Sequence, residues 1–258
     1  MKPRPLFFVP LVILVVSFFM TWTLSADELT IVADPYMPYT GDPASDHPGF
    51  MIEIAKAILE KAGHTINYKQ VAWDEAMSQA KNADVTAIVG ASKDDLPDFI
   101  FPEIEQASAQ GVFYVSTASS WKYTNVASLE KVCLGIINNY NYTDIQPYIK
   151  SNKSNSTKIR MFSDSNALEK MVDALIEGKI QAFVEDQNVM KEFLKTYPKA
   201  DKIMEAGKLR VPSKLYIAFS PKRAEAQEMS KLISDGTKAM RADGSLKKIL
   251  DRYNVQDW

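Results

Sequence analysis

Cysteine, histidine and clustered basic residues are scarce in this chain of 258 residues. The single cysteine, Cys133, excludes an intrachain disulfide, and its apolar surroundings predict a small buried side chain. The histidines, His47 and His64, lack metal-ligand spacing to other donors, so no metal site and no cofactor are expected. Lys and Arg (30) nearly balance Asp and Glu (32) without a basic run, which argues against a nucleic-acid partner.

Catalytic motifs are also missing. The chain has no Gly-x-Ser-x-Gly segment, no His-Glu-x-x-His segment and no histidine near a candidate serine. A secreted hydrolase would have to use a carboxylate pair such as Asp95 and Asp186, as glycosidases do. Facing carboxylates serve equally well to bind an amine, so a hydrolase is the weakest of the functions considered and the chain is not expected to be an enzyme.

One long apolar run is present, from Leu6 to Leu24. Lys2 and Arg4 precede it and small residues follow it, which predicts a signal peptide over residues 1–26 with cleavage near Ala26. An uncleaved membrane anchor is the alternative, because the run is close to the length that spans a bilayer. Because a signal peptide directs secretion, we expect a periplasmic protein. No second run of this kind follows, so the chain is not expected to be a permease itself.

Strand and helix patterns alternate along the rest of the chain and predict an α/β fold. A second series of units begins after residue 120 and repeats the order of the first without repeating its sequence. We expect a type II periplasmic binding protein architecture of two lobes, each a mostly parallel sheet flanked by helices, with a hinge between them. The predicted boundaries are residues 27–116 plus 217–258 for the first lobe and 117–216 for the second.

The carboxyl ends of predicted strands indicate where a ligand would bind. Two prolines stiffen the loop after strand 29–33 and hold two tyrosines there. Polar and small residues follow strand 85–89, an Asn/Tyr-rich loop follows strand 132–137, and an acidic pair ends strand 180–184. The predicted ligand-binding residues are Tyr36, Tyr39, Trp73, Gly90, Ala91, Ser92, Asp95, Asn139, Tyr140, Asn141 and Asp186.

Four segments together resemble the family 3 extracellular solute-binding proteins, the type II periplasmic binding proteins that supply ABC transporters with amino acids. They are the aromatic-Pro-aromatic loop 36–39, the Gly-Phe helix start 49–55, the segment from Trp73 to Gly90, and the strand Gly178–Asp186. The resemblance covers nearly the whole chain after residue 26. It implies hinge closure around a small ligand and a membrane permease as partner.

One residue that the family uses is absent. In members that bind amino acids, an Arg after the pocket strand clamps the α-carboxylate and an Asp in the second lobe accepts the ammonium. Asp186 matches the second role, whereas the Arg position falls at or next to Asp95, and no Arg occurs between Met51 and Lys158. An aspartate would repel a carboxylate instead of forming the bidentate pair.

Two interpretations of this departure are open. In one, Asp95 and Asp186 hold a cationic or amine-rich ligand, with aromatic rings supplying cation–π faces. In the other, Asp94, Asp95 and Asp98 form a solvated loop, and backbone N–H groups at residues 139–142 meet a ligand anion. The predicted function is a monomeric solute-binding protein for an amino acid or amine-like ligand, serving an ABC transporter. A periplasmic module that reports its ligand to a membrane sensor is the alternative.

Overall fold

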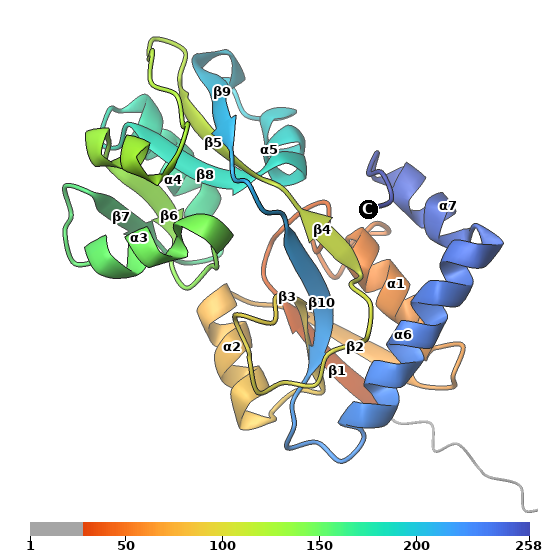
Figure 1. The fold of residues 1–258 in the computed structure, drawn as a ribbon. Coiled ribbons are helices and arrows are strands. Elements are labelled where there is room, and N and C mark those ends of the chain that lie inside the picture. Colours follow the sequence, from red (N-terminus) through yellow and green to blue (C-terminus); the bar gives the residue numbers. More distant parts are fainter. Residues whose placement is uncertain (1–27) are drawn as a thin grey trace, which may run out of the picture.

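The computed structural model describes residues 28–258, and the predicted signal peptide lies outside the described residues. Strands in this part of the chain form two five-stranded sheets, each flanked by helices (Figure 1). The predicted two-lobed α/β fold is therefore confirmed. No helix among residues 28–258 has the length and apolarity needed to cross a membrane.

The sheet of lobe 1 has the strand order β2-β1-β3-β10-β4. Its first three strands are parallel, while β10 runs antiparallel to both β3 and β4. Helices α1, α6 and α7 pack on one face and α2 on the other (Figure 1). The elements are β1 (Glu28–Ala33), α1 (Phe50–Leu59), β2 (Thr65–Gln70), α2 (Trp73–Asn82), β3 (Ala87–Ala91), β4 (Ala107–Ala109), β10 (Ser213–Phe219), α6 (Ala226–Asp243) and α7 (Ser245–Arg252).

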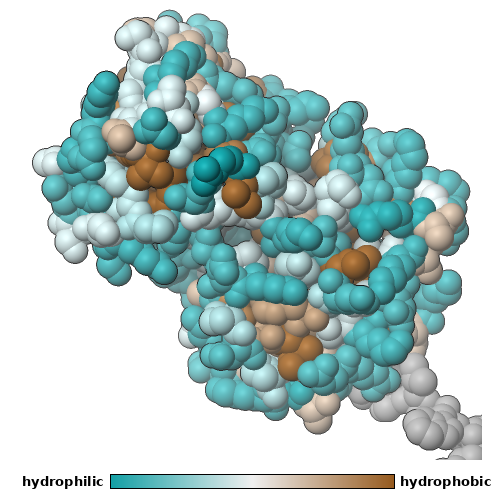
Figure 2. Space-filling model, viewed as in Figure 1, coloured by the Kyte–Doolittle hydropathy of each residue, from teal (hydrophilic) through white to brown (hydrophobic). Residues whose placement is uncertain are grey.

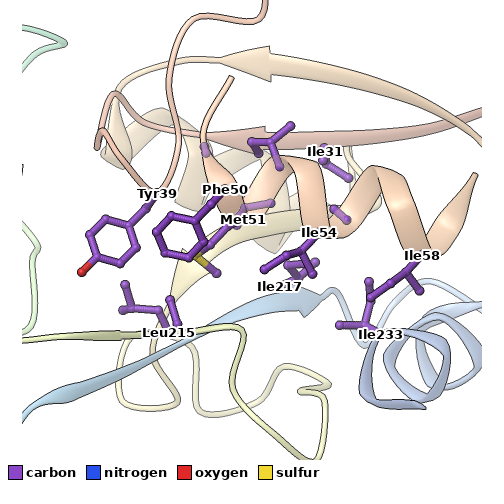
Figure 3. Close-up of a cluster of buried hydrophobic side chains, with 14 of the residues drawn as sticks. Ile31, Tyr39, Phe50, Met51, Ile54, Ile58, Leu215, Ile217 and Ile233 are labelled. Atoms are coloured by element: carbon purple, nitrogen blue, oxygen red, sulfur yellow. The ribbon is translucent and has the colours of Figure 1, made fainter. Parts of the chain in front are cut away.

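The apolar face of α1 anchors the core of lobe 1. Phe50, Met51, Ile54 and Ile58 recur at helical spacing and pack against β10 and α6 (Figure 3). Burying each such side chain stabilises the fold by about 1.5–3 kcal/mol. Tyr39 lies at the edge of this cluster with its hydroxyl pointing out of it (Figure 3). The core therefore holds one end of Tyr39 and leaves the polar end for other contacts.

The sheet of lobe 2 has the order β7-β6-β8-β5-β9. Strands β7, β6 and β8 are parallel, and β5 is antiparallel to its neighbours β8 and β9. Cys133, which was predicted to be buried, is half-buried just before β6. The elements are β5 (Gly111–Ser116), η1 (Val126–Lys131), β6 (Leu134–Ile137), η2 (Thr143–Ile145), α3 (Gln146–Asn152), β7 (Ile159–Phe162), α4 (Ala167–Ile176), β8 (Ala182–Asp186), α5 (Gln187–Leu194), η3 (Ala200–Lys202) and β9 (Ile203–Lys208), where η denotes a 3-10 helix.

Two crossings connect the lobes, and both lie earlier in the chain than the predicted boundaries. The first is at Gln110, between β4 in lobe 1 and β5 in lobe 2, because β5 pairs with β8 and β9. The second follows Leu209 and precedes β10. The Gln110 side chain donates to the carbonyls of Gly111 (3.0 Å) and Leu209 (2.9 Å), so the two crossing segments lie side by side. Two adjacent strand connections of this kind are a typical hinge.

The face of the molecule in Figure 2 is mostly hydrophilic, with apolar residues in small separate patches. The large apolar side chains exposed among residues 28–258 are Val126, Met161 and Val211. Such isolated residues are normal on a soluble surface. This face therefore offers no broad apolar docking area, and the site of interest is the cavity between the lobes.

Candidate functional site

A cavity of about 80 Å³ lies between the lobes. Its volume is several times the 10–15 Å³ that holds a single water molecule, which suits a small ligand. Both lobes contribute to its wall. The lining residues are Asp34, Tyr36, Thr40, Trp73, Gly90, Ser92, Asp95, Ala109, Gly111, Tyr140, Asn141, Tyr142, Val184, Glu185, Asp186, Leu209, Ser213 and Leu215.

The loop after β1 forms one wall of the cavity. Asp34 is the first residue beyond the strand and is only 8% exposed. The Thr40 hydroxyl donates to the Asp34 carbonyl (2.7 Å), which closes the loop. The half-buried ring of Tyr36 stacks on Tyr39 (centroids 5.0 Å apart) and meets Tyr140 of lobe 2 edge to face (5.9 Å). The stiff, proline-containing loop thus presents a carboxyl group and an aromatic ring to the cavity.

Tyr39 does not line the cavity but supports it from behind. Its fully buried ring packs on Phe50 with centroids 4.9 Å apart. Its hydroxyl lies 3.0 Å from Asp186 Oδ1 and 3.1 Å from the Ser108 carbonyl, and it accepts from the Asn188 side chain (3.1 Å). Tyr39 therefore connects the core of lobe 1 to the carboxyl end of β8 in lobe 2.

The end of β3 and the loop that follows it place Gly90, Ser92 and Asp95 in the wall. Asp95 Oδ2 accepts hydrogen bonds from the Ser92 backbone N–H (2.8 Å) and hydroxyl (2.7 Å), so it is held in a turn. Ala91 points into the core instead, and Asp94 and Asp98 are exposed. The acidic loop is thus divided between one residue in the cavity wall and two in solvent.

The loop after β6 supplies Tyr140, Asn141 and Tyr142 from lobe 2. The backbone N–H groups of Tyr140, Tyr142 and Thr143 donate to Ile137 O, Gln146 Oε1 and Asn141 Oδ1. Two of the four N–H groups at residues 139–142 that were expected to meet a ligand anion, those of Tyr140 and Tyr142, are therefore used within the loop. Asn139 is exposed and lies outside the cavity wall.

The end of β8 places two neighbouring carboxyl groups in different roles. Asp186 caps α5: Oδ1 accepts from the N–H groups of Asn188 (2.8 Å) and Val189 (3.1 Å), and Oδ2 accepts from the Gln110 N–H (2.7 Å). Glu185 Oε1 accepts from the Asp186 N–H (2.7 Å), while Oε2 is buried without a partner among the described residues. Asp186 therefore serves the hinge as well as the cavity, and Glu185 keeps one carboxyl oxygen without a partner in the described chain.

Charge in the cavity is of one sign, since its wall contains four carboxyl side chains and no Lys, Arg or His. Burial raises the pKa of Glu185 to about 8, with the Asp186 and Asp34 carboxyls adding to the rise. Burial raises the pKa values of Asp34 and Asp186 to about 6, opposed by the Tyr140 hydroxyl and the Val189 N–H respectively. Each shift reflects the cost of a carboxylate in a dry site without a cation.

Further hydrogen bonds join the lobes around the cavity. Tyr140 donates to Asp34, and Trp73 Nε1 donates to the Asn139 carbonyl (3.3 Å). Asp74 of α2 accepts from the side-chain amides of both Asn138 (3.1 Å) and Asn139 (2.6 Å). The chain is thus in a closed arrangement, with the Asn/Tyr-rich loop of lobe 2 fastened to α2.

We expect Asp74→Ala to weaken ligand affinity about fivefold, because it removes two hydrogen bonds that only the closed arrangement makes. At the exposed rim such bonds together contribute about 1 kcal/mol, and apparent affinity falls with the population of the binding-competent form. Calorimetric titration of the ligand measures the effect. Glu75→Ala is the matched control, since Glu75 accepts only from Gln79 on the same helix in the described chain. Equal affinity of the two variants would contradict the role of Asp74 in closure.

The structure thus brings eight of the predicted site residues to the cavity wall: Tyr36, Trp73, Gly90, Ser92, Asp95, Tyr140, Asn141 and Asp186. Tyr39, Ala91 and Asn139 are not among the lining residues. Sequence reasoning missed Asp34 and Glu185, although both stand at strand ends, the signal that selected Asp186. No group of metal-ligating side chains occurs among residues 28–258.

A cavity enclosed by two hinged α/β lobes defines a class of ligand-binding proteins. The chain matches the bacterial extracellular solute-binding proteins, family 3, over residues 29–256, and it belongs to this family. The resemblance drawn from the sequence motifs is confirmed. No curated protein matches the chain significantly.

Solved structures share the fold at low sequence identity. A histidine kinase sensor domain with similarity to periplasmic binding proteins has a TM-score of 0.73 at 15% identity, covering 88% of this chain and 95% of that one. A putative L-cystine ABC transporter from Listeria monocytogenes has a TM-score of 0.72 at 15% identity, covering 88% of this chain and 95% of that one. An ancestral arginine-binding protein bound to arginine has a TM-score of 0.69 at 21% identity, covering 88% of this chain and 97% of that one.

Proposed function

We propose that this protein binds one small ligand carrying an ammonium group, an amino acid or a related amine, and delivers it to the permease of an ABC transporter. The observation that carries the proposal is the cavity between the lobes, with four carboxyl side chains and no cationic side chain in its wall. We further propose that the chain is processed near Ala26 and acts in the periplasm as a monomer that binds without chemical conversion.

Hinge closure is the proposed mechanism. The ligand would enter between open lobes, contact one of them first, and be enclosed when the loop 138–142 reaches α2. Closure removes water from the cavity, which strengthens interactions between an ammonium group and the wall. The closed form also presents both lobes to a membrane partner in one fixed arrangement.

A sensory role is the second candidate, supported by the likeness to a histidine kinase sensor domain. In that role the closed form would signal to a membrane receptor, because the same closure serves transport and sensing. The neighbouring genes separate the two: a permease and an ATPase would support uptake, and a sensor kinase would support signalling.

A thermal-shift screen tests the proposed ligand class. The purified chain is heated with amino acids, polyamines, small organic acids and sugars in turn. A ligand at 100 times its dissociation constant stabilises the folded state by about 2.7 kcal/mol, so a true ligand raises the melting temperature by several degrees. We expect shifts only with compounds that carry an ammonium group. A shift produced only by sugars or organic acids would refute the proposal.

A further inference from the structure

The negative charge of the cavity wall disfavours the α-carboxylate of an ordinary amino acid. A free α-carboxylate needs a cationic or N–H donor partner when it is taken out of water. The wall has no Lys, Arg or His. Lys93, which follows the wall residue Ser92, turns its ammonium toward the ring of Tyr216, 5.2 Å from the centroid. A ligand carboxylate would therefore meet four carboxyl side chains and no cationic side chain, with the Asn141 amide as an uncharged N–H donor in the wall.

The hydrogen bonds of the four carboxyl groups single out one of them. Asp95 accepts from Ser92, Asp34 accepts from Tyr140, and Asp186 accepts from three backbone N–H groups. Glu185 is 3% exposed; the Tyr36 hydroxyl lies near its carboxyl and lowers its pKa, but Oε2 has no hydrogen-bond partner among the described residues. A buried polar atom without a partner is costly. A donor from the ligand would remove that cost.

The position of Glu185 also gives a ligand room in two directions. Glu185, Asp34 and the rings of Tyr36, Trp73 and Tyr140 border both the main cavity and an adjoining one of about 40 Å³. The smaller cavity is lined by two further acidic residues, Asp74 and Asp164, and likewise has no Lys, Arg or His in its wall. Asp164 pairs with Lys170 (2.6 Å) outside that wall, so Asp74 is the one of the two without a cationic partner in the described chain. Both spaces therefore favour positive charge, and Glu185 stands where they meet.

The aromatic lining indicates an organic cation. Tyr36, Trp73, Tyr140 and Tyr142 all border the main cavity. Burial raises the pKa values of these tyrosines well above 10, so their hydroxyls stay protonated and neutral. Ring faces attract ammonium groups by cation–π interaction. A metal ion would instead need clustered oxygen or nitrogen ligands, and residues 28–258 contain no such group.

We propose that the ligand is an organic amine without a carboxylate, and that Glu185, together with Asp34, accepts its ammonium group. This inference rests on the proposed ligand-binding function and narrows it. Asp186, the residue at the family's ammonium-binding position, is then chiefly a cap for α5 and a support for the hinge. An elongated amine would extend past Glu185 into the adjoining cavity.

Matched pairs of compounds test the absence of a carboxylate. The full chain is titrated by calorimetry with four amines and with the amino acids that differ from them by one carboxylate: putrescine and ornithine, cadaverine and lysine, agmatine and arginine, tyramine and tyrosine. We expect at least one amine to bind at least tenfold more tightly than its amino acid. Equal or tighter binding of the amino acid in every pair that binds would overturn this inference and leave the broader function standing. No binding by any of the eight compounds, with binding of a sugar or an organic acid, would overturn both.

Glu185→Gln tests the assigned residue. It keeps the shape of the side chain and removes the charge, so we expect the best amine to bind at least tenfold more weakly while the melting temperature of the free protein is unchanged or higher. Glu205→Gln, an exposed glutamate on β9 of the same lobe, is the matched control and should bind as the parent does. The preference for the amine over its amino acid should also narrow in Glu185→Gln. Parent affinity in a folded Glu185→Gln variant would overturn the assignment.

Discussion

Asp186→Ala is expected to lower the free energy of unfolding by about 3 kcal/mol. The carboxyl group accepts from the backbone N–H groups of Asn188 and Val189 at the start of α5 and from Gln110 at the first crossing between the lobes. Losing a helix cap costs about 1 kcal/mol, and each buried N–H left unpaired costs about 1–3 kcal/mol. Removing the buried carboxylate offsets part of this loss of stability, because burial disfavours the charged form of Asp186 and raises its pKa to about 6.

Chemical denaturation of the ligand-free chain measures this change. Asp186→Asn is the matched control, since asparagine caps helices about as well as aspartate and keeps one acceptor oxygen. We expect it to lose less than half as much stability as Asp186→Ala. An Asp186→Ala variant as stable as the parent would show that the hinge and α5 do not depend on this carboxyl group.

Amine affinity is expected to rise roughly tenfold per pH unit from pH 6 to pH 8 and then to level off. Burial raises the pKa of Glu185 to about 8, so in the ligand-free protein this carboxyl is mainly protonated at neutral pH. An ammonium group binds the carboxylate, and the proton therefore competes with the ligand below pH 8. The plateau should hold until the amine itself loses its proton, near pH 10 for an alkylamine.

Other titratable groups around Glu185 affect this profile at different pH values. Asp34 from lobe 1 and Asp186 on the same strand have pKa values raised by burial to about 6, so they add to the slope only near or below pH 6. The pKa values of Tyr36, Tyr140 and Tyr142 are raised by burial above 10, so these hydroxyls do not titrate in the range.

Calorimetric titrations at pH 6, 7, 8 and 9 provide the measurement. At pH 7, buffers of different ionisation enthalpy should reveal the release of about one proton per ligand bound. Glu185→Gln should bind with a nearly flat profile between pH 6.5 and 8. A steep profile that survives in this variant would assign the proton to another group.

Asp34 connects the ligand site to closure, because its carboxyl faces the cavity and accepts the Tyr140 hydroxyl from the other lobe. An ammonium group between Asp34 and Glu185 would stabilise both carboxylates only when the lobes are together. Ligand charge and lobe closure would then favour one another, which is the differential interaction that a ligand-driven conformational change requires.

The amino-acid sequence by itself determined the class of fold. The apolar positions of Phe50, Met51, Ile54 and Ile58 recur at helical spacing, and the apolar run at 85–89 is strand-like, so local physics alone separates helix from strand there. Strand ends also marked the cavity wall at Tyr36, Ser92 and Asp186. The absence of any Arg between Met51 and Lys158 could be read directly from the residues, and it agrees with a cavity wall that has no cationic side chain.

Tertiary structure decided which of these residues do what. Strand β5 belongs to the sheet of lobe 2 because it pairs with β8 and β9. These partners lie far along the chain, and the sequence of a single strand does not encode its partner, so the sequence did not place β5 in that lobe. Glu185 and Asp186 are neighbours at the same strand end, yet the start of α5 engages Asp186 with backbone donors, while Glu185 Oε2 has no partner among the described residues. Tertiary packing also decides the role of Tyr39. Its ring packs on Phe50, and this directs its hydroxyl to Asp186 instead of the cavity.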